Sequence, residues 1–466
     1  MNVCVIGTGY VGLVTGTCLA YLGHSVICVD NNPQKIALLD EGKSPIYEPG
    51  LEALIDHGIQ RGTLTFTMDL GEAVRSSEVV FIAVGTPPLP SGDPDLQYVE
   101  AVARGIGASA TDTQTRVVVN KSTVPIGSGN WVEMLIEDGA NAHRSVPAGS
   151  GSLKAPETHQ FLVASNPEFL REGSAIGDTL YPDRIVIGAQ NPEAVSILRE
   201  LYAPLLDQSF EAPAVAPRPE GIRAVPLVTT DLASAEMIKY AANAFLATKI
   251  SFINEVANLC EKVGADITQV AKGIGLDTRI GSRFLNAGAG WGGSCFGKDV
   301  SALISIGREY QYEMEMLRAT VSVNARQRQR LIQKLQEALK LLKGKTIGLL
   351  GLAFKPNTDD LRDAPALDVA RQLLKMGARV KAYDPIAMPH CREQHPDLDL
   401  HYAESVEELA IGCDALVLIT EWNEFKTMDL TMVRDLMRTP VLLDARNALS
   451  PEMSHSHGFT YLGVGR

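Results

Sequence analysis

The feature that most constrains the fold is a glycine-rich turn between a predicted strand and a predicted helix at the start of the chain. Residues 2–6 (NVCVI) form a continuous apolar run, as expected of a strand buried in a parallel sheet. Gly7, Gly9 and Gly12 follow with the spacing GxGxxG, and then come a helical stretch and a second strand, SVICVD. Gly7 permits the tight turn, Gly9 lets the backbone approach a pyrophosphate, and Gly12 lets the helix pack on the strand. The pattern predicts a β-α-β unit that binds a dinucleotide at the helix N-terminus.

Asp30, which ends the second strand, indicates which dinucleotide this unit binds. A carboxylate at this place accepts the ribose hydroxyl groups and repels a 2′-phosphate, which favours NAD over NADP. Lys35 lies just beyond it and either contacts the ribose or is an ordinary solvated helix lysine. The alternatives are a similar turn without a ligand and one that holds FAD.

Strands and helices alternate along the chain in the way that is typical of doubly wound parallel sheets. Further apolar strands are predicted at 78–85, 115–123 and 184–189. A second β-α-β unit begins at KTIGLLGLAF, and its strands are predicted at 378–385, 414–420 and 441–446. A long helix is predicted from Thr230 to Gly264, with more helix to about Lys343.

We therefore predict an α/β fold in which two Rossmann-like, doubly wound parallel-sheet domains are joined by a central helical domain with a long helix. The predicted domains are residues 1–215, 228–335 and 336–466. Two segments rich in Pro, Ala, Gly and Ser, residues 141–159 and 211–226, are expected to be exposed insertions or linkers.

The second β-α-β unit is not expected to bind NAD, because it lacks the third glycine. After Gly348 and Gly351 the place of Gly12 is assigned to Phe354. The loop that follows carries Lys355 and Arg362, which are cations suited to another phosphate ligand. NAD is thus expected on the first sheet domain and a phosphorylated substrate on the second.

Charge and cysteine content exclude several classes of function. The net charge of −13 argues against nucleic acid as the main partner. The seven cysteines are scattered and form no Cys-x-x-Cys pair, which predicts a reduced, cytoplasmic protein with neither disulfides nor a metal site. The first 29 residues carry no Asp, Glu, Lys or Arg, but glycines interrupt them and no basic segment precedes them, so neither a signal peptide nor a membrane span is expected.

The segment GWGGSCFGKD (290–299) is the strongest indication of covalent chemistry. Glycines around Cys295 let a bulky ligand approach, and a thiol at a helix start beside Lys298 is expected to ionise readily. The alternative is a buried core cysteine, the commoner fate of this residue. Asp299 could serve only as a helix N-cap.

Three further polar residues are candidates for the same site. Lys239 and Asn243 lie four residues apart on the long predicted helix, where they could stabilise an oxyanion or belong to an exposed polar stripe. Glu168 follows the strand FLVAS in a loop and could be a general base or a capping or salt-bridging residue.

Taken together, these segments resemble the UDP-glucose/GDP-mannose dehydrogenase family over nearly the whole chain. The resemblance is carried by GTGYVGL, VGTP, STVP, NPEFLREGSAIGD, KYAANAFLATKISFINE, RIGSRFLNAG, GGSCFGKD and GLAFKPNTDDLRDAPA. It implies two Rossmann-like domains bridged by a long helix, assembled as a dimer or higher oligomer through that helix. The two insertions and Trp291, which stands where a smaller aromatic is commoner, depart from the family pattern.

The resemblance also implies a role for individual residues. It implies catalytic roles for Cys295 as nucleophile, Lys239 and Asn243 as oxyanion partners, Asp299 as an aid to Lys239 and water, and Glu168 and Thr123 in hydrolysis. It implies NAD contacts for Gly7, Gly9, Tyr10, Val11, Gly12, Asp30, Lys35, Thr86, Thr123, Glu172, Lys298 and Arg362. It implies contacts to the nucleotide sugar for Glu168, Phe169, Leu170, Arg171, Glu172, Lys239, Asn243, Arg283, Asn286, Gly290, Gly292, Phe354, Lys355 and Arg446, with Arg283 reaching across a dimer interface.

The expected reaction is the NAD-dependent, four-electron oxidation of UDP-glucose to UDP-glucuronate through a cysteine thiohemiacetal and thioester. The alternatives within the same chemistry are GDP-mannose and UDP-N-acetylhexosamines. A simple two-electron hydroxyacid dehydrogenase, which needs no cysteine, and a non-catalytic NAD-binding protein are less consistent with the joint occurrence of these residues.

Overall fold

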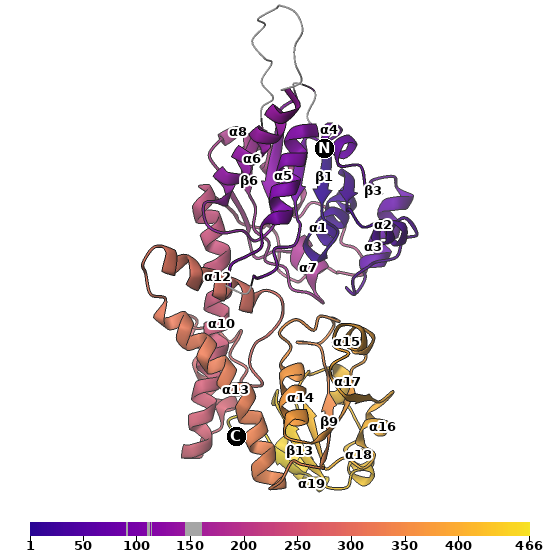
Figure 1. Ribbon diagram of the computed structural model, residues 1–466, viewed down its shortest axis with the longest axis vertical. Coiled ribbons are helices and arrows are strands. Elements are labelled where there is room, and N and C mark those ends of the chain that lie inside the picture. Colours follow the sequence, from indigo (N-terminus) through magenta and orange to yellow (C-terminus); the bar gives the residue numbers. More distant parts are fainter. Residues whose placement is uncertain (90–91, 110–111, 113, 145–160) are drawn as a thin grey trace, which may run out of the picture. The chain divides into compact units, whose positions relative to one another are not determined.

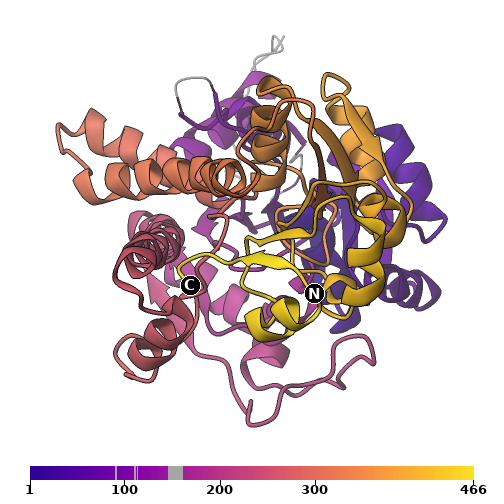
Figure 2. The ribbon, with the colours of Figure 1, turned by 90° about the horizontal axis from the view of Figure 1, so that it is seen from below.

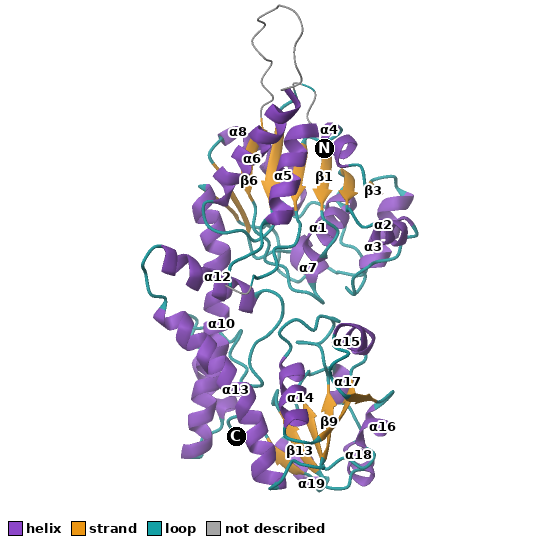
Figure 3. Cartoon of the chain, viewed as in Figure 1, coloured by secondary structure: helices purple, strands orange, loops and turns teal. Residues whose placement is uncertain are grey.

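The computed structural model describes residues 1–89, 92–109, 112, 114–144 and 161–466, and these form two compact units, Met1–Ala241 and Ala242–Arg466 (Figure 1). Each unit contains one sheet with helices packed against it (Figure 3). This confirms the predicted α/β class with two sheet domains and a central helical region.

The sheet of the first unit has the strand order β3-β2-β1-β4-β5-β6-β7-β8 among the described residues. Its strands are β1 (Asn2–Ile6), β2 (Ser25–Val29), β3 (Leu64–Thr67), β4 (Val79–Ile82), β5 (Arg116–Asn120), β6 (Phe161–Ser165), β7 (Ile185–Ala189) and β8 (Leu227–Thr230). The strands from β1 to β6 pair in parallel, whereas β7 pairs antiparallel with β6 and β8 runs parallel to β7. The predicted parallel sheet is therefore confirmed for six strands. At one edge of the sheet, β7 and β8 run in the opposite direction to these six.

Alternate residues of each strand pack on opposite faces of this sheet, since successive side chains of a strand point to opposite sides. Val3 and Val5 belong to one apolar cluster, while Cys4 and Ile6 belong to the other. The first face is covered by α1 (Tyr10–Tyr21), α2 (Pro33–Asp40), α3 (Leu51–Gln60), α7 (Ala175–Leu180), α8 (Pro192–Leu201) and α9 (Ala203–Leu206). The second is covered by α4 (Leu70–Arg75), α5 (Gln97–Ser109) and α6 (Ser128–Arg144), and Figure 1 shows α5 and α6 side by side across the strands. The loops that follow β1, β4, β5 and β6 therefore leave the same edge, where ligands bind in open α/β sheets.

The two predicted insertions differ from expectation. Helix α6 continues to Arg144, so the loop prediction is wrong for 141–144, and residues 145–159 lie outside the described residues. Residues 211–226 contain no helix or strand, as predicted, but they are not simply exposed. Ala216 and Val225 are buried in the core of the first unit, and the Tyr181 hydroxyl donates a hydrogen bond to Ala216 O (2.8 Å). This segment therefore contributes to packing.

The long predicted helix is α10, which extends over Leu232–Val263 and spans the division between the two units. Asp231 accepts hydrogen bonds from the Ser234 amide (2.8 Å) and hydroxyl (2.7 Å), which satisfies an otherwise unpaired donor of the first turn. In the described part of the chain, no helix combines the length and apolar character needed to cross a bilayer.

The sheet of the second unit is parallel throughout, with the order β11-β10-β9-β12-β13-β14. Its strands are β9 (Thr346–Leu350), β10 (Arg379–Tyr383), β11 (Leu400–Tyr402), β12 (Ala415–Leu418), β13 (Val441–Asp444) and β14 (Thr460–Leu462). One face packs against α10, α11 (Ile267–Gly275), α13 (Glu315–Leu339), α14 (Pro365–Lys375) and α15 (Met388–Gln394), and the other against α16 (Val406–Ala410), α17 (Asn423–Lys426) and α18 (Leu430–Leu436). The remaining helices are α12 (Phe296–Glu309) and α19 (Pro451–Ser456).

The C-terminal residues of the second unit pack beside α10, as Figure 2 shows. The Gly465 amide donates to Glu261 Oε1 (2.8 Å), and Gly465 O accepts from the Ile267 amide (2.9 Å). The residues that follow the last strand, β14, thereby form hydrogen bonds with the helical part of their own unit.

The predicted register of the second glycine turn is wrong. Gly348 lies inside β9, where a Cβ would come within 2.6 Å of the Leu416 side chain. Gly351 is the counterpart of Gly7: both follow the first strand of their unit with φ near +100° (+95° and +103°). The place of Gly12 therefore falls on Pro356, not Phe354, and α14 begins only at Pro365. A loop replaces the phosphate-binding helix start, which still agrees with the expectation that NAD does not bind here.

Candidate active site

The turn after β1 has the geometry that a dinucleotide site requires. A Cβ on Gly7 would lie 2.6 Å from Ala83 O, and one on Gly12 would lie 1.9 Å from Gly7 O, so both glycines are needed for packing. A Cβ on Gly9 would meet no atom within 4 Å, so the space beside this residue is open to a ligand. Helix α1 begins immediately after Gly9, and its first N–H groups have no side-chain cap. These features fit a pyrophosphate held at a helix N-terminus.

Asp30 is held in place by the same turn. Its Oδ2 accepts the Thr8 amide (3.0 Å) and hydroxyl (2.6 Å), and its Oδ1 accepts the Asn32 amide (3.0 Å). Burial alone would raise the pKa of Asp30, but these hydrogen bonds and the charge of Lys35 bring the pKa below its ordinary value. An ionised carboxylate at this place fits NAD and repels the 2′-phosphate of NADP. Lys35 Nζ lies 3.7 Å from Asp30 Oδ2, and the lysine side chain is 38% exposed.

Asp384 occupies the corresponding place in the second unit, but its environment differs. Its Oδ2 accepts the amides of Leu352 (2.7 Å) and Ala353 (3.1 Å) and the indole N–H of Trp422 (3.2 Å). Asp384 is completely buried, so it is not available to ribose hydroxyl groups. The two sheets thus share a glycine turn with a hydrogen-bonded acid. The Asp30 side chain keeps a small exposed area (9%), whereas Asp384 has none.

Other predicted cofactor residues of the first unit lie near the same edge of its sheet. The Thr86 hydroxyl donates to Thr123 O (2.9 Å), which joins the loops after β4 and β5. The Tyr10 hydroxyl donates to Tyr47 O (2.7 Å), and Glu172 is buried in the loop after β6.

Glu168 and Lys239 form a buried ion pair in the first unit. Lys239 Nζ donates to Glu168 Oε1 (2.6 Å) and to Glu168 O (2.7 Å), while Oε2 accepts the Leu170 amide (2.8 Å). Both side chains are less than 10% exposed (5% and 7%), so the alternative of an exposed polar stripe is wrong for Lys239. Burying two charges is costly unless both are paired, so each of these side chains needs the other in order to stay charged. The centre of the Phe169 ring lies 3.5 Å from the Arg184 guanidinium and 5.5 Å from Lys239 Nζ.

Lys121 belongs to this cluster, although the sequence reasoning missed it. Its Nζ donates to Asn166 Oδ1 (3.0 Å), which also accepts the Tyr202 hydroxyl (2.6 Å). Burial lowers the pKa of Lys121 to about 8; the Glu168 carboxylate opposes this shift and the Lys239 charge adds to it. The signal in the sequence was a lysine directly after the buried strand RVVVN.

Residues of this cluster line a cavity of about 60 Å³. It is lined by polar residues from the strand ends and by apolar residues of α1, among them Lys121, Asn166, Glu168, Arg184, Tyr202 and Leu19. Its volume is enough for small molecules the size of water.

In the second unit, Cys295 has the surroundings of a reactive thiol. It is the residue before the first turn of α12, it is partly exposed, and its Sγ lies 3.5 Å from the Ser294 hydroxyl. The other six cysteines are buried. Burial raises the pKa of Cys4, Cys18, Cys28, Cys391 and Cys413, which keeps those thiols protonated and unreactive. The core-residue alternative therefore applies to those cysteines and not to Cys295.

Asp299 lies one helical turn after Cys295 and forms hydrogen bonds with two other predicted site residues. It accepts Asn243 Nδ2 (2.6 Å) on one oxygen and Lys298 Nζ (2.8 Å) on the other. Its amide donates to Cys295 O (2.9 Å), and its side chain is completely buried. The alternative of Asp299 as an N-cap is wrong, because Cys295 holds that position. Asn243 is also buried, which excludes an exposed stripe for this residue as well.

The loop before Cys295 is shaped by glycines and fixed by α13. A Cβ on Gly290 would lie 2.4 Å from Asn324 Oδ1, and one on Gly292 would lie 2.2 Å from Asp363 O. Asn324 accepts the Trp291 amide (2.8 Å) and donates to Trp291 O (3.0 Å). The backbone of this loop is therefore held rigidly by buried side chains.

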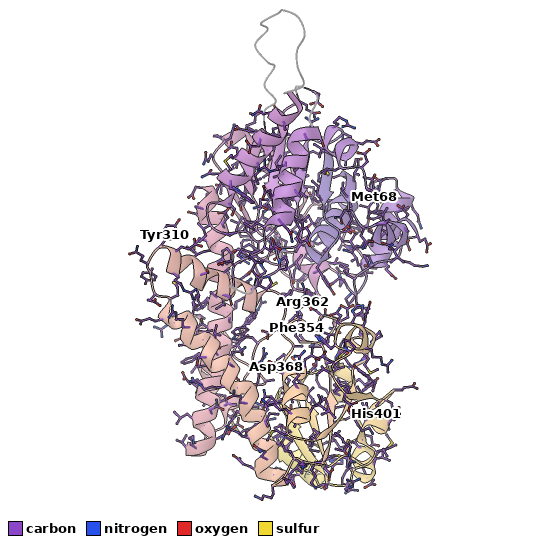
Figure 4. All side chains as sticks on the ribbon, in the orientation of Figure 1. Met68, Tyr310, Phe354, Arg362, Asp368 and His401 are labelled. Carbon is purple, nitrogen blue, oxygen red and sulfur yellow. The ribbon has the colours of Figure 1, made fainter. Side chains whose placement is uncertain are left out.

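Several predicted substrate residues converge on this loop. Arg446 donates to Gly290 O (3.4 Å) and Phe354 O (3.2 Å). Phe354 and Arg362, which are labelled in Figure 4, lie on the loop between β9 and α14; Arg362 is paired with Asp360 (2.7 Å). Lys355 Nζ lies 5.1 Å from the Phe354 ring. Arg283 and Asn286 are exposed.

Comparisons with known proteins agree with this arrangement. The UDP-glucose/GDP-mannose dehydrogenase family matches in three parts: its NAD binding domain over residues 1–206, its central domain over 233–326 and its UDP binding domain over 348–451. A UDP-glucose 6-dehydrogenase of Rhizobium meliloti (strain 1021) is 46% identical over 471 residues, which covers 100% of both chains. A UDP-glucose 6-dehydrogenase of Bacillus subtilis (strain 168) is 45% identical over 465 residues, covering 100% of this chain and 93% of that protein.

A solved structure leads to the same conclusion. The UDP-glucose dehydrogenase of the hyperthermophilic archaeon Pyrobaculum islandicum superposes with a TM-score of 0.86 at 39% identity, covering 99% of this chain and 97% of that one. The resemblance inferred from the motifs is confirmed, and NAD is the cofactor that the first unit accommodates. The chain belongs to the UDP-glucose/GDP-mannose dehydrogenase family.

Proposed function

We propose that this protein oxidises the C6 alcohol of UDP-glucose to the carboxylate of UDP-glucuronate, with NAD as oxidant. Relatives that are 45–46% identical over the whole chain carry the name of this activity. The observation that carries the proposal is Cys295, a partly exposed thiol at the start of α12 next to the Asp299–Asn243 hydrogen bond. A four-electron oxidation needs a group that retains the aldehyde, and a thiol of this kind supplies it.

Each oxidation step uses groups with a defined task. Bound NAD supplies the hydride acceptor in both steps. After the first hydride leaves C6, the Cys295 thiolate adds to the aldehyde carbon, and the resulting oxyanion is stabilised by Lys239 and Asn243. Loss of the second hydride from this thiohemiacetal leaves a thioester on Cys295. Asp299 orients the Asn243 amide through the hydrogen bond of 2.6 Å.

Hydrolysis completes the sequence. Glu168 accepts a proton from water as the water oxygen bonds to the thioester carbon, and the C–S bond breaks to return the thiolate of Cys295. Thr123 helps to place this water. One alcohol, two NAD⁺ and one water thus give one carboxylate, two NADH and three protons. Because thioester hydrolysis is strongly favourable, the overall reaction runs one way.

The remaining site residues keep the roles that the family resemblance implies. Gly7, Gly9, Tyr10, Val11, Gly12, Asp30, Lys35, Thr86, Thr123, Glu172, Lys298 and Arg362 would contact NAD. Residues 168–172, Arg283, Asn286, Gly290, Gly292, Phe354, Lys355 and Arg446 would contact the nucleotide sugar. The division into domains 1–215, 228–335 and 336–466 also stays a prediction, as does assembly into a dimer through α10, with Arg283 serving the site of a second copy.

The substrate is tested by mixing the purified protein with NAD and each nucleotide sugar. We expect UDP-glucose to react fastest and to release two NADH for each sugar consumed. Faster turnover of GDP-mannose or of a UDP-N-acetylhexosamine would replace UDP-glucose with that sugar. Release of one NADH and a free aldehyde would point to a simple two-electron dehydrogenase.

Replacing Cys295 tests the covalent route. In the Cys295→Ser variant we expect UDP-glucuronate formation to fall by about 10³-fold or more, because a serine hydroxyl is a far weaker nucleophile at neutral pH, while the first hydride transfer persists. Cys413→Ala, which alters a buried thiol on the second sheet, serves as the control and should keep acid formation. Rapid-quench analysis of sugar products separates the two steps. Unchanged acid formation in Cys295→Ser would rule out the thioester.

A further inference from the structure

Two loops of the second unit that carry predicted substrate residues lie against each other. The Cys295 loop, residues 286–294, precedes α12, and the β9–α14 loop is formed by residues 351–364. A Cβ on Gly292 in the first loop would lie 2.2 Å from Asp363 O in the second. The two backbones therefore pass so closely that only glycine fits at this position, and any shift of one loop changes its contact with the other.

Arg328 on α13 donates to both loops. Its Nη2 lies 2.9 Å from Trp291 O in the Cys295 loop and 3.1 Å from Asp363 O in the β9–α14 loop. Its Nη1 forms ion pairs with Asp363 Oδ1 (2.8 Å) and with Asp368 in the first turn of α14. Asp363 has a left-handed backbone (φ +49°), which is uncommon for a residue other than glycine. The planar guanidinium, whose donors point in fixed directions, thus serves four acceptors and connects the two loops.

The contact of Arg328 with Trp291 extends to the reactive thiol. The Trp291 side chain is buried, and its Nε1 donates to Ser251 Oγ on α10 (3.0 Å). The Trp291 ring meets the Phe296 ring edge-on, with the ring centres 6.4 Å apart. Phe296 is the first residue of α12 and directly follows Cys295. The place of the Trp291 backbone therefore influences where α12 begins, and with it the position of the thiol.

Arg328 acts on the site through these loops and not by direct contact. Its side chain is 8% exposed, and protein atoms accept its hydrogen bonds. Arg446 also donates to both loops, at Gly290 O and Phe354 O, but it is itself a predicted substrate residue. The two arginines thus differ in kind: Arg446 would bind the ligand, whereas Arg328 supports the loops that carry it.

We propose that Arg328 is a positioning residue that holds the Cys295 loop and the β9–α14 loop in the arrangement to which UDP-glucose binds. The inference rests on the proposed function, because it takes Gly290, Gly292, Phe354 and Lys355 on these loops as substrate contacts. A site that is already arranged binds its ligand more tightly than one that the ligand must first order. Loss of the Arg328 contacts should therefore weaken binding, whereas saturating UDP-glucose should restore the arrangement and most of the turnover rate.

Arg328→Lys separates binding from turnover. A lysine keeps the positive charge but lacks the planar fork that serves both peptide oxygens. If about a tenth of the molecules then keep the binding arrangement, the Kd and KM for UDP-glucose rise about tenfold. A tenfold change in affinity is about 1.4 kcal/mol, which is within what the loss of one hydrogen bond to a charged group can cost. We expect kcat at saturating UDP-glucose to fall by less than about twofold.

Arg330→Lys is the matched control, because Arg330 lies two residues further along α13 and pairs with Glu261 on α10 (3.2 Å). If Arg328 only stabilised α13, both lysine variants would melt at a lower temperature and keep the wild-type affinity for UDP-glucose. The proposal instead requires a weaker affinity in Arg328→Lys alone. Asp368→Asn is a milder second variant: it removes one carboxylate that holds the guanidinium, at a side chain that is 39% exposed, and should raise the Kd for UDP-glucose about threefold.

The experiment measures binding and turnover separately. Calorimetric titration with UDP-glucose in the absence of NAD gives the Kd, and NADH formation at a series of UDP-glucose concentrations gives KM and kcat. Thermal unfolding verifies that each variant is folded. Hydrogen exchange followed by mass spectrometry should show faster exchange in both loops of ligand-free Arg328→Lys, and UDP-glucose should remove most of this difference.

The outcomes distinguish the inference from the proposed function. Unchanged affinity for UDP-glucose in folded Arg328→Lys or in Asp368→Asn, or an equal loss of affinity in Arg330→Lys, overturns the inference alone. So does a lower kcat with an unchanged Kd. A wild-type protein that binds UDP-glucose without oxidising it overturns the proposed function, while the titrations still decide the inference. A wild-type protein that does not bind UDP-glucose overturns both.

Discussion

At the scale of single residues, Gly9 and Gly12 serve the turn after β1 in different ways. A Cβ on Gly9 would meet no atom within 4 Å, whereas one on Gly12 would lie 1.9 Å from Gly7 O. Their spacing and the acid at Asp30 predict a dinucleotide turn, and the open space at Gly9 and the close packing at Gly12 fit that prediction. Such local motifs are readable because the interacting atoms lie within one β-α-β unit. The contact of Lys121 with Asn166 was not predicted, because it joins residues 45 apart in the sequence through the pairing of β5 with β6. The same limitation applies to Asn324, whose contact with Trp291 depends on tertiary packing.

Alanine at Gly9 and at Gly12 separates binding from folding. Gly9 has an extended backbone (φ −78°, ψ −173°) that alanine adopts freely, and its Cβ would meet no protein atom. We therefore expect Gly9→Ala to fold with a melting temperature within about 2 °C of wild type but to bind NAD at least about tenfold more weakly, because the methyl group occupies ligand space. In Gly12→Ala the Cβ would lie 1.9 Å from Gly7 O, so we expect a loss of about 2 kcal/mol or more in unfolding free energy. Calorimetry measures the stability of each variant, and titration with NAD measures its affinity for the cofactor. Tight NAD binding by Gly9→Ala would contradict this placement of the pyrophosphate.

At the scale of elements, the apolar pattern located ten of the fourteen described strands and the long helix, and it missed the short strands β3, β8, β11 and β14. It did not fix direction or register. The run RIVIGA correctly predicts β7, yet nothing in it indicates that β7 is antiparallel to β6, because direction is set by the partner strand. The sequence analysis aligned Gly348 and Gly351 with the glycines of the first turn, but Gly348 lies inside β9. Its actual role is to give Leu416 room within the sheet. The short helices escaped prediction because their few residues carry little periodicity.

Glu236 on α10 links this helix to the start of α6 and makes stability depend on pH. Its carboxylate accepts the amides of Gly127 (2.6 Å) and Gly129 (3.1 Å). Burial raises its pKa to about 7, although these hydrogen bonds act in the opposite direction. The folded protein thus holds this proton more tightly than the unfolded chain does. The stabilisation that Glu236 contributes is complete below its unfolded pKa of about 4.3 and is lost as the pH rises through 7.

Glu236→Gln tests this linkage, because the amide does not titrate. We expect the unfolding free energy of wild type, relative to the variant, to decrease by about 3 kcal/mol between pH 4.5 and 8. Urea unfolding at a series of pH values measures the difference. The variant also loses a hydrogen-bond acceptor, which contributes a constant offset and leaves the slope as the readout. A difference that stays constant over this range would show that folding does not shift the pKa of Glu236.

At the scale of the whole molecule, the sequence predicted two sheets and a helical region between them, and the structure confirms this order. It also predicted assembly through α10, and one face of this helix has the expected character. Phe245, Phe252 and Leu259 recur every seven residues and are 65%, 53% and 58% exposed. Residues seven apart lie on one helix face, and Ile253, Ala257 and Cys260 on another face are buried in the core of the second unit. An exposed apolar stripe on an otherwise packed helix is typical of an interface between subunits.

Phe252→Glu tests whether this stripe holds two copies together. A charge in the middle of an apolar interface is left unpaired when the interface forms, so we expect the variant to be monomeric at 50.1 kDa where wild type has twice that mass. Ile411→Glu is the matched control, because Ile411 is similarly exposed (56%) but follows α16 on the second sheet. Light scattering after size-exclusion chromatography measures the mass, and a dimeric Phe252→Glu or a monomeric wild type would contradict the proposed interface. The same variant also tests the predicted role of Arg283 in catalysis. If it serves the site of the second copy, the monomeric variant should lose UDP-glucose turnover and retain NAD binding, whereas full activity in the monomer would place Arg283 in the site of its own chain.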